Sequence, residues 1–385
     1  MDISVKFIKE SKEIEVEFIK KINSKEKDSK FSFLLAKSFN IEEVIFLDKK
    51  MNWDKEEESV DLLPELYRYT INLPNISSDL IIKYRGNLRG NHRYYSDYLI
   101  HFSLYNVWYP LIEEDKAEYN ISLDIGYDWE LIRGKYNHDK KRWEISYIDE
   151  AFNDCNILLV NKEVYRIVEN NFVKIYFLDY QKNYAKYILD NYTKVNEYYE
   201  KLYGRENSYK ENIAILPYNK EWPNSDYKRD RLTVLTTNIE KIDMNSLFSH
   251  SLKNFAHEMG HNYGCGADAS TWEDWLNETI AEWSALLYIK NVEKRDINTY
   301  IEEHKKYLES DKLILNPKGV DHPKDVHDVG TLIFYSIFVK YGEESIKKLL
   351  ISFDKLKDKN TKNYLDYLDN NGLEYLSDEI RKYII

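Results

Sequence analysis

The hydrophobic pattern of this chain is typical of β-strands up to about residue 165 and changes its period from about residue 177, and this change limits the folds that the chain can adopt. Before that point, apolar and polar residues alternate in short runs that favour β-strands, and turn-forming residues separate many of the runs. We expect strands within residues 4–19, 67–73, 80–84, 99–108, 119–125, 142–147 and 156–160. Strands so closely spaced predict a β-sandwich-like N-terminal domain over residues 1–165.

After residue 177 the apolar residues recur with the spacing of α-helices. Residues 180–203 predict one helix, with Gly204 as its C-terminal cap. Two short strands are expected at residues 213–216 and 232–236, and nearly all of the chain after residue 246 has a helical pattern. The predicted fold class is therefore α+β, with the β-rich domain followed by a mostly helical domain over residues 166–385.

The composition indicates a folded, acidic protein. Hydrophobic residues make up 43% of the 385 residues, and the 12 glycines and 7 prolines are too few for long disordered linkers. The 55 basic and 67 acidic side chains give a net charge of −12, which argues against nucleic acid as a partner.

The chain has two cysteines, Cys155 and Cys265, and no apolar run long enough for a signal peptide or a membrane span. So few cysteines exclude a disulfide framework and fit a reducing compartment. We therefore expect a cytoplasmic protein that does not enter the membrane. The sequence carries no sign of its oligomeric state.

Residues 257–261 read His-Glu-Met-Gly-His, which is the pattern HExxH. On a helix, positions i and i+4 share a face, so His257 and His261 can bind one metal ion. Glu258 is rotated by about 100° from His257 and can act as a general base without becoming a ligand. The alternative is an ordinary helix with two surface histidines, but apolar residues at 252, 255, 256 and 259 indicate a packed helix.

A catalytic zinc ion takes three protein ligands and keeps one position for water, so a third ligand must lie elsewhere. We expect the first helix to end at Gly264 and Gly266 and a second, amphipathic helix to follow. Four apolar side chains of that second helix are expected to be buried: Leu276, Ile280, Trp283 and Leu287. Glu278 and Glu282 lie four residues apart on it, so either carboxylate can reach the metal. A thiolate ligand from Cys265 is a further alternative.

The two motifs together resemble a known family. HExxH followed by the WLNE sequence of residues 275–278 resembles the gluzincin zinc peptidases, in particular the family of aminopeptidase N and leukotriene hydrolase. In that family the glutamate of WLNE is the third zinc ligand, which implies this role for Glu278 beside His257 and His261. The resemblance also implies Zn²⁺ as the cofactor, a peptide substrate, and a thermolysin-like catalytic domain within residues 166–385.

Two positions depart from the family pattern. The segment around Gly330 resembles the family's YxKGxxxF helix, but His327 stands where that helix has the tyrosine that stabilises the oxyanion. A histidine can donate the same hydrogen bond, and His322 and Tyr335 are other candidate donors. The family's GxMEN motif, whose glutamate binds the free amine of a substrate, has no counterpart, and residues 225–231 are rich in basic side chains instead.

These features lead to three hypotheses about function. The first is a zinc peptidase, either an aminopeptidase or one of another specificity, with Glu258 as the base and His327 as the oxyanion donor. The second keeps the zinc but hydrolyses a non-peptide substrate, such as an epoxide or another amide. The third is a non-catalytic binding module on a peptidase fold, against which the intact Glu258 argues because binding alone needs no general base.

Overall fold

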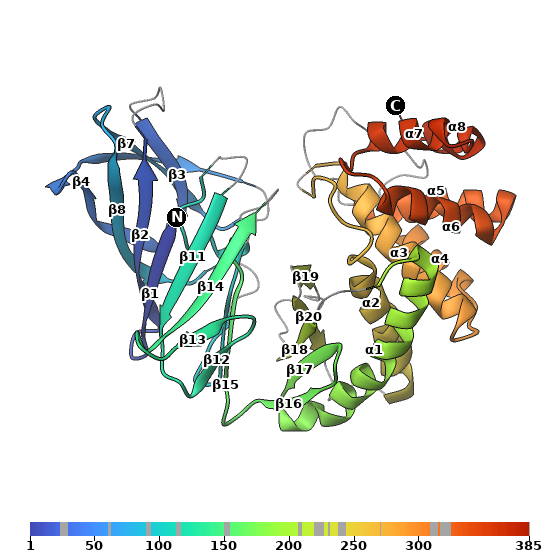
Figure 1. Ribbon diagram of the computed structural model, residues 1–385, viewed down its shortest axis with the longest axis horizontal. Coiled ribbons are helices and arrows are strands. Elements are labelled where there is room, and N and C mark those ends of the chain that lie inside the picture. The colour runs from blue at the N-terminus through green and yellow to red at the C-terminus, as the bar shows by residue number, and fades with distance from the viewer. Residues whose placement is uncertain are drawn as a thin grey trace. The chain divides into compact units, whose positions relative to one another are not determined.

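The computed structural model describes residues 1–23, 30–60, 63–89, 94–112, 117–149, 155–206, 210–218, 227–229, 232–237, 244–269, 271–308, 315 and 325–384. The chain divides into two units, which are treated one after the other (Figure 1). The β unit consists mainly of Met1–Arg166, and the helical unit consists of Ile167–Tyr218 and Asp226–Ile385.

The β unit is built from strands whose apolar residues alternate along the chain. In β2 (Glu13–Ile22) and β8 (Ser78–Asn87) nearly every second residue is buried, because one face of each strand lies on a core. An eight-stranded sheet has the order β13-β14-β11-β1-β2-β8-β4-β5, and two smaller sheets have the orders β3-β7-β6 and β12-β15-β10-β9. Within the large sheet, β1 pairs antiparallel with β2 and parallel with β11.

The remaining strands of the β unit have the following bounds: β1 Asp2–Ile8, β3 Lys30–Ala36, β4 Phe39–Phe46, β5 Lys49–Lys50, β6 Trp53–Glu58, β7 Leu66–Asn72, β9 Tyr94–Tyr95, β10 Leu99–Phe102, β11 Ala117–Asp124, β12 Trp129–Leu131, β13 Lys135–Asn137, β14 Arg142–Asp149, β15 Ile157–Asn161. The expected strand at residues 99–108 was too long, since β10 ends at Phe102 and a 3-10 turn follows at Leu104–Asn106. Asn106 explains the break, because its side chain accepts a hydrogen bond from the backbone N–H of Ser103 and closes that turn.

The helical unit combines a five-stranded sheet with eight helices among its described residues. The sheet has the order β16-β17-β18-β20-β19, in which β18 is parallel to β17 and β20, and β19 is antiparallel to β20. The strands and helices have these bounds: β16 Arg166–Glu169, β17 Val173–Phe177, β18 Glu211–Pro217, β19 Tyr227–Arg229, β20 Leu232–Thr237, α1 Lys182–Tyr203, α2 Met244–Gly260, α3 Asp274–Asn291, α4 Asn298–Lys306, α5 Val326–Tyr341, α6 Glu343–Asp354, α7 Thr361–Asn370, α8 Glu374–Arg381. The prediction of a β-rich first part and a helical later part is thus confirmed.

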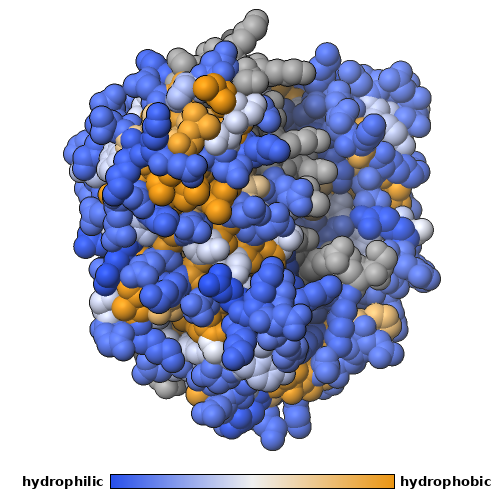
Figure 2. Space-filling model, turned by 60° about the vertical axis from the view of Figure 1, so that its left-hand side comes forward, coloured by the Kyte–Doolittle hydropathy of each residue, from blue (hydrophilic) through white to orange (hydrophobic). Residues whose placement is uncertain are grey.

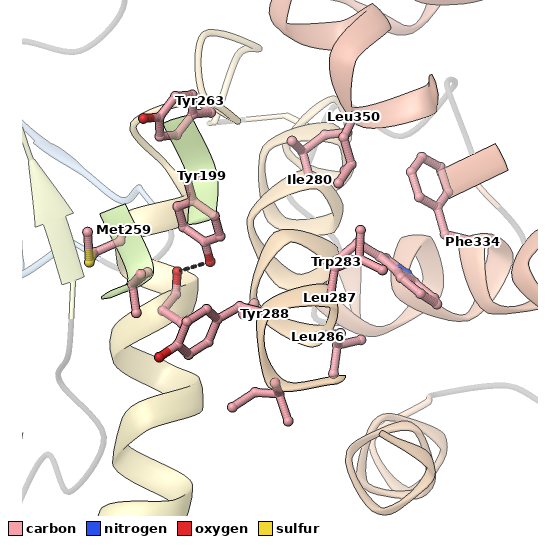
Figure 3. Close-up of a cluster of buried hydrophobic side chains, with 14 of the residues drawn as sticks. Tyr199, Met259, Tyr263, Ile280, Trp283, Leu286, Leu287, Tyr288, Phe334 and Leu350 are labelled. Atoms are coloured by element: carbon pink, nitrogen blue, oxygen red, sulfur yellow. Dashed lines mark hydrogen bonds between the residues drawn. The ribbon is translucent and has the colours of Figure 1, made fainter. Parts of the chain in front are cut away.

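Helix α1 joins the sheet to the helices. It follows a 3-10 turn at Asp179–Gln181 and ends before Gly204, whose left-handed conformation (φ 71°) forms the predicted cap. Figure 3 shows the core of this unit, where Tyr199 of α1 donates a hydrogen bond of 2.7 Å to the carbonyl of Ala256 in α2. This bond and the surrounding aromatic and aliphatic side chains fix α2 against α1.

Helix α3 lies at the centre of this core and contacts α1, α2, α5 and α6. Every residue from Asp274 to Ile289 is buried except Glu278. The four apolar residues expected to be buried are buried, but the expected amphipathic helix was wrong, because other helices cover α3 on all sides. Glu278 is therefore the one place in this span where the helix opens towards solvent.

One face of the molecule is largely hydrophilic (Figure 2). Figure 2 also shows that hydrophobic side chains form groups between the hydrophilic ones on this face. In the described part of the chain, no helix has both the length and the hydrophobicity needed to cross a membrane.

Candidate metal centre

The two histidines of the HExxH motif lie at the C-terminal end of α2. The helix ends at Gly260, one residue before His261, so the predicted end at Gly264 and Gly266 was wrong. Beyond Gly260 the backbone tightens, because the N–H of Asn262 bonds to the carbonyl of Met259 three residues back. The turn still keeps His261 beside His257, with 4.9 Å between the ring centroids.

Close helix packing brings a carboxylate to these histidines. At Gly260, a Cβ atom would lie only 2.8 Å from the carbonyl oxygen of Ala281, so the glycine allows the backbone of α2 to touch α3. Glu278 lies one turn before Ala281 on α3, and its side chain is 13% exposed. The close approach of the two helices explains why Glu278 reaches both histidines.

His257, His261 and Glu278 form a cluster that can hold a metal ion. One ligand atom from each residue lies within 4.8 Å of the other two. The Nε2 of His257 is 3.2 Å from one carboxylate oxygen of Glu278, and the Nε2 of His261 is 3.7 Å from the other. Two ligands of a tetrahedral zinc ion, each about 2.0–2.1 Å from the metal, lie about 3.3 Å apart. The separations and the two-imidazole, one-carboxylate donor set therefore fit zinc.

The structure separates the two candidate carboxylates of α3. Glu282 is 2% exposed and contacts the opposite edge of His257, where Oε2 lies 2.8 Å from Nδ1. Because a carboxylate accepts hydrogen bonds, Nδ1 of His257 must carry the proton, and Nε2 is the nitrogen that faces Glu278. A carboxylate behind a ligating histidine fixes its tautomer and the direction of its ring.

These contacts determine the charges of the cluster. Burial by itself lowers the pKa of His257, but hydrogen bonds to Glu278 and Glu282 outweigh it and raise that pKa to about 10. For Glu282, an acid, burial acts in the opposite direction and would raise the pKa. The positive charges of Lys253, whose Nζ lies 2.7 Å away, and of His304 nevertheless hold that pKa well below its ordinary value. Without a metal, His257 thus carries a proton that a divalent cation would have to displace.

The sequence also suggested three catalytic residues, Glu258, His327 and Tyr335, which lie at different places in the helical unit. Glu258 follows His257 on α2 and is buried, with 8% of its surface exposed. His327 lies in the first turn of α5 with a half-exposed side chain, and its Nδ1 lies 2.8 Å from Oε2 of Glu278. Tyr335 lies eight residues after His327 on α5, about 12 Å away along the helix, and its hydroxyl donates to Asn298.

Two other sequence candidates contribute nothing to this cluster. His322 lies outside the described residues. Cys265 is exposed and is not among the groups of the described residues that could share a metal ion, and both cysteines of the chain are free. Residues 225–231 stand where the family has its GxMEN motif. Of these residues the structure describes only β19, the short edge strand of the sheet.

Two residues that complete the surroundings of the cluster were not predicted from the sequence. His304 of α4 places Nε2 2.8 Å from Oε1 of Glu282 and Nδ1 2.7 Å from Oδ1 of Asp328 on α5. Asp328 could have been suspected from its place next to His327. His304 has no motif around it, and only the packing of α4 against α5 brings it to Glu282.

Comparisons with known proteins agree with the fold. No family profile and no curated protein sequence matches the chain. Native yeast LTA4 hydrolase superposes with a TM-score of 0.71 at 14% identity, over 98% of this chain and 65% of the yeast protein. An M1 zinc metallopeptidase from Deinococcus radiodurans superposes with a TM-score of 0.62 at 11% identity, over 99% of this chain and 92% of that protein.

The chain thus spans slightly less than two thirds of the yeast enzyme. At such low identity the likeness concerns the fold alone, in which a β-rich region precedes a helical one. The chain therefore has the fold of LTA4 hydrolase and of the M1 zinc metallopeptidases.

Proposed function

We propose that this protein is a zinc-dependent peptidase with a thermolysin-like catalytic domain in the helical unit. His257, His261 and Glu278 hold Zn²⁺, and their convergence from α2 and α3 is the observation that carries the proposal. Three ligands leave one coordination position for water or substrate, as in other catalytic zinc sites. Both cysteines are free, which supports a cytoplasmic location.

The chain's own residues supply the proton transfers of peptide hydrolysis. Zinc, when bound, would act as a Lewis acid that polarises the scissile carbonyl and acidifies a water molecule. Glu258 accepts the proton of the attacking water and delivers it to the nitrogen of the leaving amine. Its place beside His257 on α2 supports this role, because there it can flank the metal without being a ligand.

His327 stabilises the negative oxygen that develops on the substrate. In the protonated ring both nitrogens are donors, so Nδ1 donates to Glu278 and Nε2 donates to the oxyanion. The side chain is 52% exposed, which leaves it accessible to a substrate. A donor of this kind contributes about 3 kcal/mol to catalysis in comparable sites.

A second candidate is a zinc hydrolase of a non-peptide substrate. The likeness to yeast LTA4 hydrolase favours it, since the name of that protein gives a substrate other than a peptide. The absence of the GxMEN motif points in the same direction, because the amine-binding glutamate of an aminopeptidase has no counterpart in this sequence.

One set of measurements separates these candidates. Purified protein is analysed for metal and then assayed on fluorogenic peptides with free and with acetylated N-termini, alongside Glu258→Gln. We expect one zinc per chain, cleavage by the wild type, and a rate 10²–10⁴ times lower for Glu258→Gln with unchanged zinc content. Zinc without any peptide cleavage would favour the non-peptide substrate, and absence of stoichiometric metal would refute both candidates.

A further inference from the structure

His304 joins two buried carboxylates that come from different helices. Its Nε2 contacts Glu282 of α3 at 2.8 Å, and its Nδ1 contacts Asp328 of α5 at 2.7 Å. Both partners are acceptors when ionised, so both ring nitrogens of His304 must carry a proton. The side chain is only 14% exposed, and the charged imidazole therefore depends on these two contacts.

Glu282 continues this chain of contacts to the candidate metal ligand. One of its oxygens accepts from His304, and the other lies 2.8 Å from Nδ1 of His257 and 2.7 Å from Nζ of Lys253. Two cations, Lys253 and His304, thus alternate with two anions, Glu282 and Asp328. Of these four groups, only Glu282 contacts a candidate ligand through the described hydrogen bonds.

Stability alone is a poor explanation for this arrangement. Burying ions costs hydration free energy, and apolar side chains of similar volume often stabilise a core as well or better. The same unit contains a large cluster of buried apolar side chains, including Trp283 one residue after Glu282. The ionic chain does what apolar packing cannot, because its hydrogen bonds fix the position of each oxygen of Glu282.

We infer that His304 is a positioning residue of the metal centre, through which Asp328 on α5 influences metal affinity without being a ligand. This inference rests on the proposed function. His304 holds Glu282 in the orientation that keeps Nδ1 of His257 protonated and Nε2 free for the metal. Asp328 in turn fixes the orientation of the His304 ring. The helix that carries His327 is thereby connected to the ligand on α2.

A double-mutant cycle tests this connection. The zinc dissociation constant is measured by competition with a chromophoric chelator for the wild type, His304→Gln, Asp328→Ala and the double variant. We expect His304→Gln to weaken zinc binding about tenfold and Asp328→Ala severalfold, while the double variant binds no more weakly than His304→Gln alone. Lys305→Gln, on an exposed position of the same helix, is the matched control and should bind zinc like the wild type.

Each outcome has a separate meaning. Equal zinc affinity of His304→Gln and wild type would refute the inference and leave the proposed function intact. An effect of Asp328→Ala that persists in the His304→Gln background would also refute it, because Asp328 would then act by another route. A wild type that binds no stoichiometric zinc would refute the proposed function as well. If His304→Gln fails to fold, as judged by circular dichroism, Asp328→Ala and Asp328→Asn are compared instead, and affinities equal to that of the wild type overturn the inference.

Discussion

The β unit and the helical unit bury different kinds of side chain. Among its described residues, the β unit buries no carboxylate at all. The described part of the helical unit buries five: Glu211, Glu258, Asp274, Glu282 and Asp328. A buried carboxylate costs several kcal/mol unless cations or hydrogen bonds compensate it. The β unit is therefore organised by apolar packing, whereas the helical unit also maintains a costly arrangement of buried charge.

Three of those five carboxylates belong to the candidate metal centre or its surroundings. Glu258 is the proposed base, and Glu282 and Asp328 belong to the chain of contacts that runs through His304. The other two have local partners, since Thr233 donates to Glu211 and Asn277 donates to Asp274. The stability of the helical unit should therefore depend on metal and on pH in ways that the stability of the β unit does not.

The largest effect is expected from the core of the β unit. Trp108 is fully buried and donates a hydrogen bond of 3.2 Å from Nε1 to the carbonyl of Cys155. Trp108→Ala should lower the free energy of unfolding by about 3–5 kcal/mol because it leaves a large cavity. Urea unfolding with and without EDTA checks this, and the loss should be the same in both. A loss that zinc reverses would contradict the separation between the units.

Removal of metal should affect the helical unit. If the cluster binds zinc, a free zinc concentration 1,000 times the dissociation constant stabilises the folded state by about 4 kcal/mol. Hydrogen exchange measured by mass spectrometry should show faster exchange in α2 and α3 after chelation, and unchanged exchange in β2 and β8. Unchanged exchange in α2 would argue against a metal at this site.

A smaller effect is expected when one carboxylate behind the ligands is neutralised. Glu282→Gln keeps the volume of the side chain but loses the charge that orients His257, so zinc affinity should fall 10–100-fold, or about 1.4–2.7 kcal/mol. Competition titration with a chelator measures this. Glu344→Gln is a suitable control, because that side chain is 77% exposed on α6. Wild-type affinity in Glu282→Gln would show that the hydrogen bond to His257 does not matter.

The smallest effect concerns an ion pair of the helical unit that is remote from the metal. Burial alone would raise the pKa of Glu343, but Lys290 at 2.6 Å and Lys347 at 3.0 Å lower it to about 2 from an ordinary value of 4.5. Since the folded-state pKa is the lower one, the pair stabilises the protein above about pH 4.5 and loses this contribution as the pH falls towards 2. Glu343→Gln should cost about 1–2 kcal/mol at pH 7 and almost nothing near pH 2, as measured by urea unfolding. An equal cost at both pH values would contradict this explanation.

The sequence predicted those parts of the fold and site that follow from local spacing. His257 and His261 came from HExxH, because four residues return a helix to the same face. Spacing alone left Glu278 and Glu282 as equal candidates, and only the resemblance of WLNE to a known family favoured Glu278. The structure separates the two by their neighbours, since Glu278 meets the Nε2 atoms of both histidines and Glu282 meets Nδ1 of one.

Contacts between distant segments escaped prediction. His304 is separated from Glu282 by 22 residues and from Asp328 by 24, and no local pattern reports such contacts. The end of α2 was misplaced for a related reason, because the contact of Gly260 with Ala281 is made between helices. The strands β3, β4 and β6 were also missed, and β6 carries one apolar residue only, so that its pairing with β7 is what makes it a strand.

The most direct test of the metal centre is X-ray absorption spectroscopy at the zinc edge on the purified, zinc-loaded protein. Coordination by His257, His261 and Glu278 predicts two imidazole nitrogens with oxygen donors at about 2.0–2.2 Å and no sulfur. In Glu278→Ala the oxygen contribution should fall while the imidazole signal remains. A sulfur scatterer at about 2.3 Å, or a protein that retains no stoichiometric zinc, would contradict this assignment.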